Sequence, residues 1–182
     1  ISGTSSNTSA ISACLYEDVI TTQIRNIRNN IFINSRSTAD GTNNNYAAYF
    51  NHAVSNSTTL DYNNYFVSGT AGVLGYWNST NKANLPLIDA KDANSFNQNP
   101  LFFNAGTTEP LDYRPYNNFS GQHIETVTVD YTNKTRSNPP YIGAFDVASS
   151  VKWTGSLDNN WNNEGNWYPR FPLSTDNIII PD

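Results

Sequence analysis

The side chains of this chain that are best suited to binding chemistry are its aromatic rings. Six of them lie in one stretch of the sequence: Tyr46, Tyr49, Tyr62, Tyr65, Tyr76 and Trp77. Such rings stack on the apolar faces of sugars when they are exposed side by side, and they pack on one another when they face a core. We predict sugar stacking by Tyr62, Tyr65, Tyr76 and Trp77. Internal stacking is the alternative, because alternate residues of a strand point inward.

Acidic and basic residues offer one local group with the composition of an acid–base site. Asp89, Lys91 and Asp92 place two carboxylic acids around an amine, which are the side-chain types that proton transfer uses. They lie in a predicted loop, where solvated charges are the ordinary state. Glu17 and Asp18 are adjacent on the chain, so on a strand they would point to opposite faces. We therefore assign no catalytic residue and favour a protein that is not an enzyme.

Histidines, cysteine and the acidic loops give no clear pattern for a nucleophile or a metal. His52 and His123 lack both the spacing of a catalytic triad and the i, i+4 spacing of a zinc-binding helix. Cys14 lies beside a leucine, which favours a small buried side chain over a reactive thiol. Residues 158–164 (DNNWNNE) offer oxygen ligands at alternate positions, but they lack the glycine and distal glutamate of an EF-hand loop. We expect no cofactor, with calcium at this loop as the alternative.

The composition points to a folded β protein. Asn, Ser and Thr together supply 65 of the 182 residues, whereas charged residues supply 14%. These short polar side chains hydrogen-bond the backbone outside helices, which disfavours a helical fold. Disorder is disfavoured by 13% aromatic residues and a net charge of only −5. The scattered cations form no basic stripe for nucleic acid, and no apolar run is long enough to span a bilayer.

An internal repeat indicates how these short strands are organised. Residues 27–34 (IRNNIFIN) align with residues 61–68 (DYNNYFVS), so that the Asn-Asn pairs coincide and Phe32 falls on Phe66. A strand-turn unit repeated at this interval predicts a solenoid, in which each coil is buried by its neighbours. An asparagine inside such a turn can donate and accept along the stack, forming a ladder of amides. Short strands are predicted at 19–22, 31–33, 46–50, 99–103 and 127–129.

Several of these runs resemble the C-terminal coils of pectate-lyase-like repeat proteins secreted by Gram-negative bacteria. The resemblance covers residues 19–146. It rests on residues 29–32 (NNIF), 61–65 (DYNNY), 92–95 (DANS) with 99–102 (NPLF), and a closing segment that ends in 141–146 (YIGAFD). The tail, with its three tryptophans and the run 178–180, is similar to a short Trp-rich module of large secreted adhesins. The chain departs from related sequences at 85–87 (LPL), where another tryptophan is usual.

The resemblance implies a right-handed parallel β-helix and a role outside the cell. On this reading the chain is a structural or adhesive segment of a large secreted or cell-surface bacterial protein, with carbohydrate or another surface ligand as its partner. Such proteins often leave the cell through the type 9 secretion machinery, so that machinery is a further expected partner. The alternative is the C-terminal part of a β-helix polysaccharide lyase or glycoside hydrolase whose active site lies upstream.

The composition changes near residue 150, where small residues give way to the Trp-rich tail. Tryptophans of this density usually anchor a small core. We predict that residues 1–147 are the C-terminal part of a parallel β-helix with its cap, residues 148–152 a linker, and residues 153–182 the start of a truncated β module. The polar beginning without Met and the apolar run 178–180, which has no later strand to pair with, predict a segment of a longer polypeptide.

Overall fold

The structure is a computed structural model that describes residues 1–6, 10–18, 24–39, 44–52, 58–103, 105–117, 119–146, 150–168, 171–172, 174 and 176–180. Most of its regular elements are short strands, which suits a chain rich in β-branched and aromatic runs separated by asparagines. Two short 3₁₀ helices, η1 (Pro110–Tyr113) and η2 (Glu164–Asn166), accompany them. The strands are β1 (Ser2–Ser5), β2 (Ser12–Glu17), β3 (Arg25–Arg28), β4 (Ile31–Thr38), β5 (Asn45–Phe50), β6 (Thr58–Asp61), β7 (Asn64–Val67), β8 (Gly72–Trp77), β9 (Thr80–Lys82), β10 (Ser150–Trp153), β11 (Trp167–Tyr168) and β12 (Asn177–Ile179).

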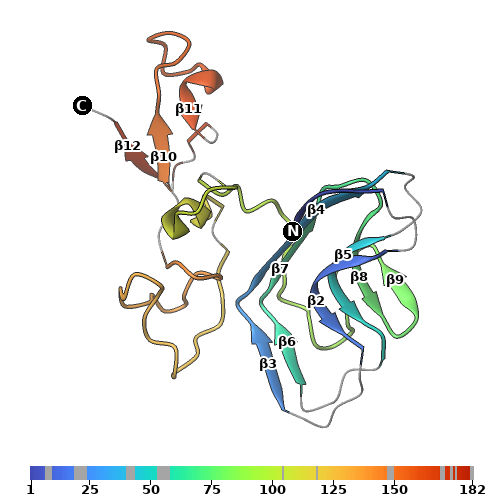
Figure 1. Ribbon diagram of the computed structural model, residues 1–182. Coiled ribbons are helices and arrows are strands. Elements are labelled where there is room, and N and C mark those ends of the chain that lie inside the picture. Colours follow the sequence, from blue (N-terminus) through green and yellow to red (C-terminus); the bar gives the residue numbers. More distant parts are fainter. Residues whose placement is uncertain are drawn as a thin grey trace.

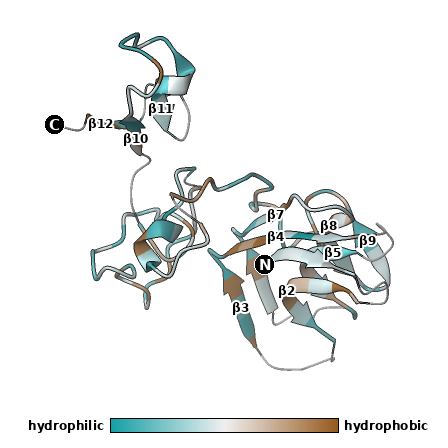
Figure 2. Cartoon of the chain, turned by 45° about the horizontal axis from the view of Figure 1, so that its top comes forward, coloured by the Kyte–Doolittle hydropathy of each residue, from teal (hydrophilic) through white to brown (hydrophobic). Residues whose placement is uncertain are grey.

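Four small sheets contain these strands (Figure 1). Their orders are β1-β4-β7, β2-β5-β8-β9, β3-β6 and β11-β10-β12. The first three consist of parallel pairs, apart from β9, which turns back antiparallel on β8. Hydrophobic stretches mark β3 and β4 in Figure 2. Within the described residues, no helix has the length and apolar character needed to cross a bilayer.

The prediction of a right-handed parallel β-helix with a C-terminal cap is wrong for this structure. The strands lie in separate sheets of two to four strands, and none of these sheets is closed or solenoid-like. The all-β class itself is compatible with the elements found. The error arises because a repeated strand-turn pattern is compatible with separate parallel sheets as well as with the stacked coils of a solenoid. The strand predicted at residues 19–22 lies outside the described residues.

The internal repeat is real, but its register differs by one residue from the sequence alignment. Phe32 pairs with Tyr65 instead of Phe66, and Ile31 pairs with Asn64. The turns before β4 and β7 correspond in the same way, since Asn29 and Tyr62 both adopt positive φ, at 60° and 53°. A one-residue slip moves every side chain to the other face of a strand, so this register decides which rings become buried.

Amides connect neighbouring strands, as the repeat predicts. The Asn30 backbone N–H and Nδ2 both donate to Asn63 Oδ1, at 3.0 and 3.1 Å. Buried Asn34 donates from Nδ2 to Ser12 Oγ at 2.9 Å and to the Tyr46 carbonyl at 2.9 Å. These amides satisfy polar groups that would otherwise be buried without partners. The Asn30–Asn63 pair is one amide-to-amide step between the two repeat copies, whereas the predicted ladder along a solenoid stack stays a prediction.

The main core lies between β5, β6, β7 and β8. Its members are almost completely buried and include Phe50, Leu60, Tyr65, Leu74 and Leu87. Gly75 allows Leu87 to approach β8, because a Cβ at this glycine would lie 2.8 Å from the leucine Cδ2 atom. The segment after β9 therefore packs its apolar side chains directly on the sheet.

Residues 119–146, which include the predicted cap, contain isolated bridges and no regular element. Hydrogen bonds to polar side chains hold this segment instead. The Arg136 guanidinium donates to the Tyr141 carbonyl at 3.1 Å and to the Gly143 carbonyl at 2.9 Å. Asp146 accepts from the Tyr141 N–H at 2.9 Å. The predicted strand at 127–129 is reduced to one bridge, between Val129 and Thr135.

The C-terminal sheet joins three strands around a tryptophan cluster. β10 pairs antiparallel with β11 and parallel with β12. The apolar run at 178–180 was expected to have no partner, but Ile178 and Ile179 pair with Val151 and Lys152. Part of the predicted linker, residues 150–152, belongs to β10, and residues 148–149 lie outside the described residues. The predicted domain boundary stays a proposal.

Candidate functional site

The four predicted sugar-stacking residues do not form one surface. Tyr65 is completely buried and stacks on Phe32 with ring centroids 5.5 Å apart. Tyr62 is half-buried in the turn before β7. Trp77 is half-buried at the end of β8, and the Lys82 ammonium lies 5.6 Å from the centre of its ring. Tyr76 is the one that joins an exposed aromatic group.

That group is a stack of three tyrosines, Tyr16, Tyr49 and Tyr76, which we call the tyrosine ladder. The rings of Tyr16 and Tyr49 are stacked at 5.0 Å, and those of Tyr49 and Tyr76 at 4.4 Å. The register of β2, β5 and β8 places all three residues in one row. Because paired strands lie about 4.8 Å apart, identical residues in register bring their rings into contact.

The ladder exposes ring edges and one ring face. Tyr49 lies between two nearly parallel rings, so both of its faces are covered. Tyr16 belongs to β2, at the end of the sheet order, and is 54% exposed. Among the described residues, the ring stacked on Tyr16 is that of Tyr49, so the outer face of Tyr16 is the one offered to an apolar surface of a ligand. Burial, followed by the neighbouring Tyr76 and Tyr16, raises the pKa of Tyr49 to about 12. Its phenol stays neutral at pH 7 and can donate or accept a hydrogen bond.

Polar groups lie beside the ladder hydroxyls. Asn51 Nδ2 donates to Asp18 Oδ1 at 2.6 Å, and the Tyr49 hydroxyl lies 3.5 Å from Asn51 Oδ1. Burial, with Asp18 as a further cause, raises the pKa of Tyr16. An aromatic face next to a carboxylate, an amide and a row of phenols is able to bind a polyhydroxylated ring.

A buried charged group lies close to the ladder and was not predicted from the sequence. Glu17 forms an ion pair with Arg25, and its Oε1 atom lies 3.4 Å from His52 Nε2. The parallel register of β2 and β5 brings these residues together, because Glu17 pairs with Phe50 and His52 follows two residues later. The side chains of His52 and Glu17 are about nine-tenths buried, so they offer little surface to a ligand. His123 is exposed.

The structure separates the group Asp89, Lys91 and Asp92. Asp89 is exposed, and the Lys91 ammonium donates to the Thr58 carbonyl at 2.9 Å. Asp92 is completely buried, where it accepts from the Leu87 N–H at 3.2 Å and from the Ser95 hydroxyl. Burial raises the pKa of Asp92 to about 6, although these hydrogen bonds oppose the shift. The three side chains therefore do not converge on solvent as an acid–base site.

The loop at 158–164 uses its oxygen atoms internally. Asp158 Oδ1 accepts from the Asn160 N–H at 2.8 Å and from Asn166 Nδ2 at 2.6 Å, while Oδ2 accepts from Asn163 Nδ2 at 2.9 Å. These amide donors lower the pKa of the Asp158 carboxyl. In the part of the chain that the structure describes, no group of three His, Cys, Asp or Glu residues is placed to hold a metal ion. Calcium binding here stays untested.

Apart from the ladder, a groove of about 510 Å³ is lined in part by the chain segments on both sides of Phe102. Its walls include Ile33, Phe66 and Phe102. The Tyr113 hydroxyl donates to the Thr107 carbonyl at 2.9 Å, so this polar group at the rim is engaged within the chain. The groove is lined by apolar and neutral polar side chains, and none of its lining residues has a charged side chain, which makes it a weaker candidate than the ladder.

Comparison with protein families, with curated proteins and with solved structures found no match for this chain. The resemblance to pectate-lyase-like β-helix proteins followed by an adhesin-type module is therefore wrong as an identification. The sheet topology gives the same result. Function has to be argued from the side chains on the surface.

Proposed function

We propose that this chain is a non-catalytic, carbohydrate-binding segment of a secreted or cell-surface protein. The tyrosine ladder carries the proposal. It presents the outer face of Tyr16 and a row of phenols next to the Asp18–Asn51 pair. An aromatic face packs against the C–H face of a sugar ring, while phenols, amides and carboxylates hydrogen-bond its hydroxyls.

The placement of the charged groups supports binding over catalysis. Among the described residues, the strongest candidate for an acid–base site is dispersed, and its one buried carboxylate is engaged by hydrogen bonds within the fold. An extracellular location fits a chain in which Asn, Ser and Thr far outnumber charged residues. Export of the native protein, by the type 9 machinery or another route, is tested by locating it in cell fractions.

The direct test is binding to insoluble and soluble polysaccharides by pull-down and calorimetry. We expect Tyr16→Ala to weaken binding by about tenfold, which corresponds to about 1.4 kcal/mol. Tyr131→Ala is the matched control, because Tyr131 has a similar exposure of 59% and lies outside the ladder. Equal binding by both variants and the unchanged chain would exclude the ladder, and lack of binding to every polysaccharide would exclude the proposed function.

A further inference from the structure

A second exposed aromatic surface lies in the C-terminal part, at Trp161. Its indole stacks on Trp153 with centroids 4.7 Å apart and planes within 10°. Trp167 meets both rings edge-on, at 5.0 Å from each. Trp167 is buried, whereas Trp161 is 47% exposed. Since Trp153 covers one face of the Trp161 indole, the exposed area includes the opposite face.

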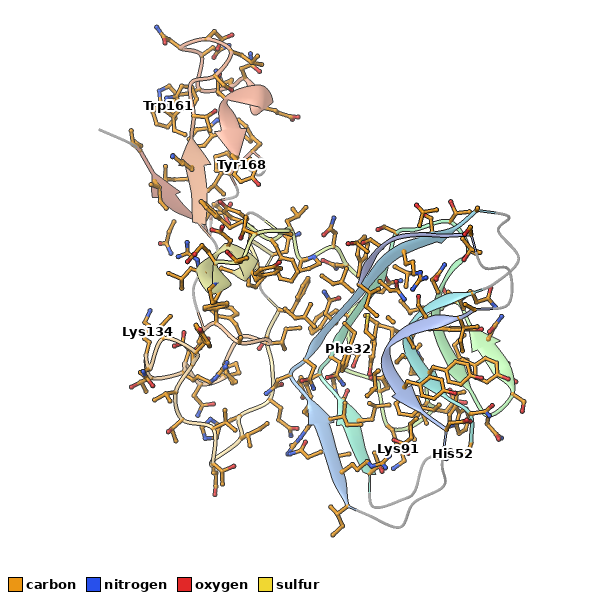
Figure 3. All side chains as sticks on the ribbon, in the orientation of Figure 1. Phe32, His52, Lys91, Lys134, Trp161 and Tyr168 are labelled. Atoms are coloured by element: carbon orange, nitrogen blue, oxygen red, sulfur yellow. The ribbon has the colours of Figure 1, made fainter. Side chains whose placement is uncertain are left out.

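Partly buried hydrogen bonds hold the loop that carries Trp161. Asn166 is completely buried, and its Oδ1 atom accepts from the N–H groups of Leu157 and Asp158, at 2.8 and 3.1 Å. The Trp167 indole N–H donates to the Trp161 carbonyl at 2.8 Å. The indole at the outer end of this part (Figure 3) is thus positioned before any ligand arrives. Preorganisation of this kind reduces the entropy that binding must overcome.

The exposed side chains of the loop that carries Trp161 suit a neutral, hydroxyl-rich ligand. Asn159 and Asn162 are exposed on the same loop, and their amides can each donate and accept. The charges of this loop are the carboxylates of Asp158 and Glu164, which would repel an acidic sugar. Lys152 is next to Trp153 on β10, so its side chain leaves the opposite face of the sheet.

We propose that the exposed face of Trp161, together with the exposed amides of Asn159 and Asn162 on the same loop, is a binding site for a neutral sugar. This site is independent of the tyrosine ladder, because it uses residues of another sheet. The indole covers the C–H face of one sugar ring, and the two amides hydrogen-bond its hydroxyls. The chain would then hold two separate contacts for the same class of ligand, which raises its avidity for a polymer.

The experiment is a titration of the whole chain with neutral hexasaccharides of glucose, xylose, mannose and N-acetylglucosamine, followed by tryptophan fluorescence and calorimetry. We expect saturable binding to at least one of them, with a change in tryptophan emission. Trp161→Ala should weaken that binding by about tenfold, or about 1.4 kcal/mol, and abolish the change in emission. Trp161→Phe, which keeps an aromatic ring on Trp153, should restore part of the affinity.

Two controls separate this site from a folding defect and from the ladder. Leu157→Ala removes a 67% exposed apolar side chain from the same loop and should leave the fluorescence response unchanged. Tyr16→Ala should also leave it unchanged, even if total affinity for a polysaccharide falls. Near-ultraviolet circular dichroism checks the tryptophan cluster in every variant.

Several results would overturn the Trp161 site. They are an unaltered affinity in folded Trp161→Ala, a response to choline or to phosphatidylcholine vesicles without one to any hexasaccharide, or Trp161-dependent self-association in place of sugar binding. If hexasaccharides bind and only Tyr16→Ala lowers the affinity, the ladder proposal stands and the Trp161 site fails. If no sugar binds to any form of the chain, both fail.

Discussion

Asp92 and Asp130 are both buried carboxylates, yet their pKa values move in opposite directions. Burial dominates at Asp92 and raises its pKa to about 6. Burial acts in the same sense at Asp130, but hydrogen bonds outweigh it and lower the pKa to about 2. These donors are the Thr132 hydroxyl at 2.7 Å and the N–H groups of Thr132, Lys134 and Asp146 at 2.8 to 3.1 Å. The balance between burial and hydrogen-bond donors decides which form of a buried acid is stable.

Asp92 should make the fold less stable as the pH rises. A raised pKa in the folded state means that its contribution is complete below about pH 4 and is lost as the pH passes through about 6. Urea unfolding of the unchanged chain should therefore show a loss on the order of 2 kcal/mol over this range relative to Asp92→Asn. The exposed Asp89→Asn serves as control and should behave like the unchanged chain. If the difference in unfolding free energy between the unchanged chain and Asp92→Asn does not vary with pH, the raised pKa of Asp92 is wrong.

Asp130 should have the opposite effect. Its lowered pKa gives stability that is present above about pH 4 and is lost as the pH falls through about 2. Asp130→Asn keeps an acceptor oxygen but places an amide N–H₂ where the Asp146 N–H donates, so we expect a loss of about 1–3 kcal/mol at pH 7. The measurement is urea unfolding between pH 2 and 7. Glu125→Gln, exposed in the same segment, is the control, and equal acid sensitivity of all three proteins would refute the prediction.

At the scale of elements, the parallel register decides which aromatic residues meet. Tyr16, Tyr49 and Tyr76 stack because β2, β5 and β8 place them opposite one another. Phe32 and Tyr65 stack for the same reason across β4 and β7. One ladder is partly exposed and the other pair reaches the core, so sequence position alone does not distinguish binding rings from packing rings.

The turn between β7 and β8 depends on Gly69. A Cβ atom at this position would fall inside the carbonyl group of Arg36, which belongs to β4 and cannot move aside as a flexible side chain could. We expect Gly69→Ala to destabilise the fold by about 3 kcal/mol or more. Gly75→Ala, whose Cβ would meet the movable Leu87 side chain, should cost about 1–3 kcal/mol. Thermal unfolding of both variants compares their losses of stability. A smaller loss for Gly69→Ala than for Gly75→Ala would contradict the close approach of Gly69 to the Arg36 carbonyl.

At the scale of the whole molecule, Tyr168 connects the C-terminal sheet to the central segment. Its hydroxyl donates to the Phe103 carbonyl at 2.8 Å, and its ring meets the Tyr116 ring edge-on at 5.6 Å. The C-terminal sheet therefore contacts the central segment across the predicted boundary near residue 150.

Loss of the Tyr168 contacts should destabilise the C-terminal sheet alone. We expect Tyr168→Ala to speed hydrogen exchange of amides in β10 and β11 by about tenfold, or about 1.4 kcal/mol. Amides of β4 and β7 should keep their protection. Tyr131→Ala, at an exposed ring of the 119–146 segment, is the control. Uniform acceleration along the chain would contradict a local effect, and no acceleration in β10 would show that Tyr168 does not stabilise the C-terminal sheet.

Part of this architecture could be predicted from the sequence. The short strands at residues 31–33 and 46–50, the Asn-Asn repeat and the tryptophan cluster were all recognisable, because each depends on neighbours along the chain. The solenoid was not a safe inference from two repeat copies, and the alignment missed the pairing of Phe32 with Tyr65 by one residue. Alternation has a period of two, so such a slip changes which face is buried.

The candidate site was predicted only in part, since Tyr76 belongs to the ladder whereas Tyr65 is buried. Tyr16 was missed because its stacking partner, Tyr49, is brought to it by pairing between distant strands. The sequence by itself determined the β character, the weak charge and the supply of aromatic and amide groups, which are properties of composition and local pattern. Only the tertiary structure decided which rings face solvent, because burial depends on long-range register and packing.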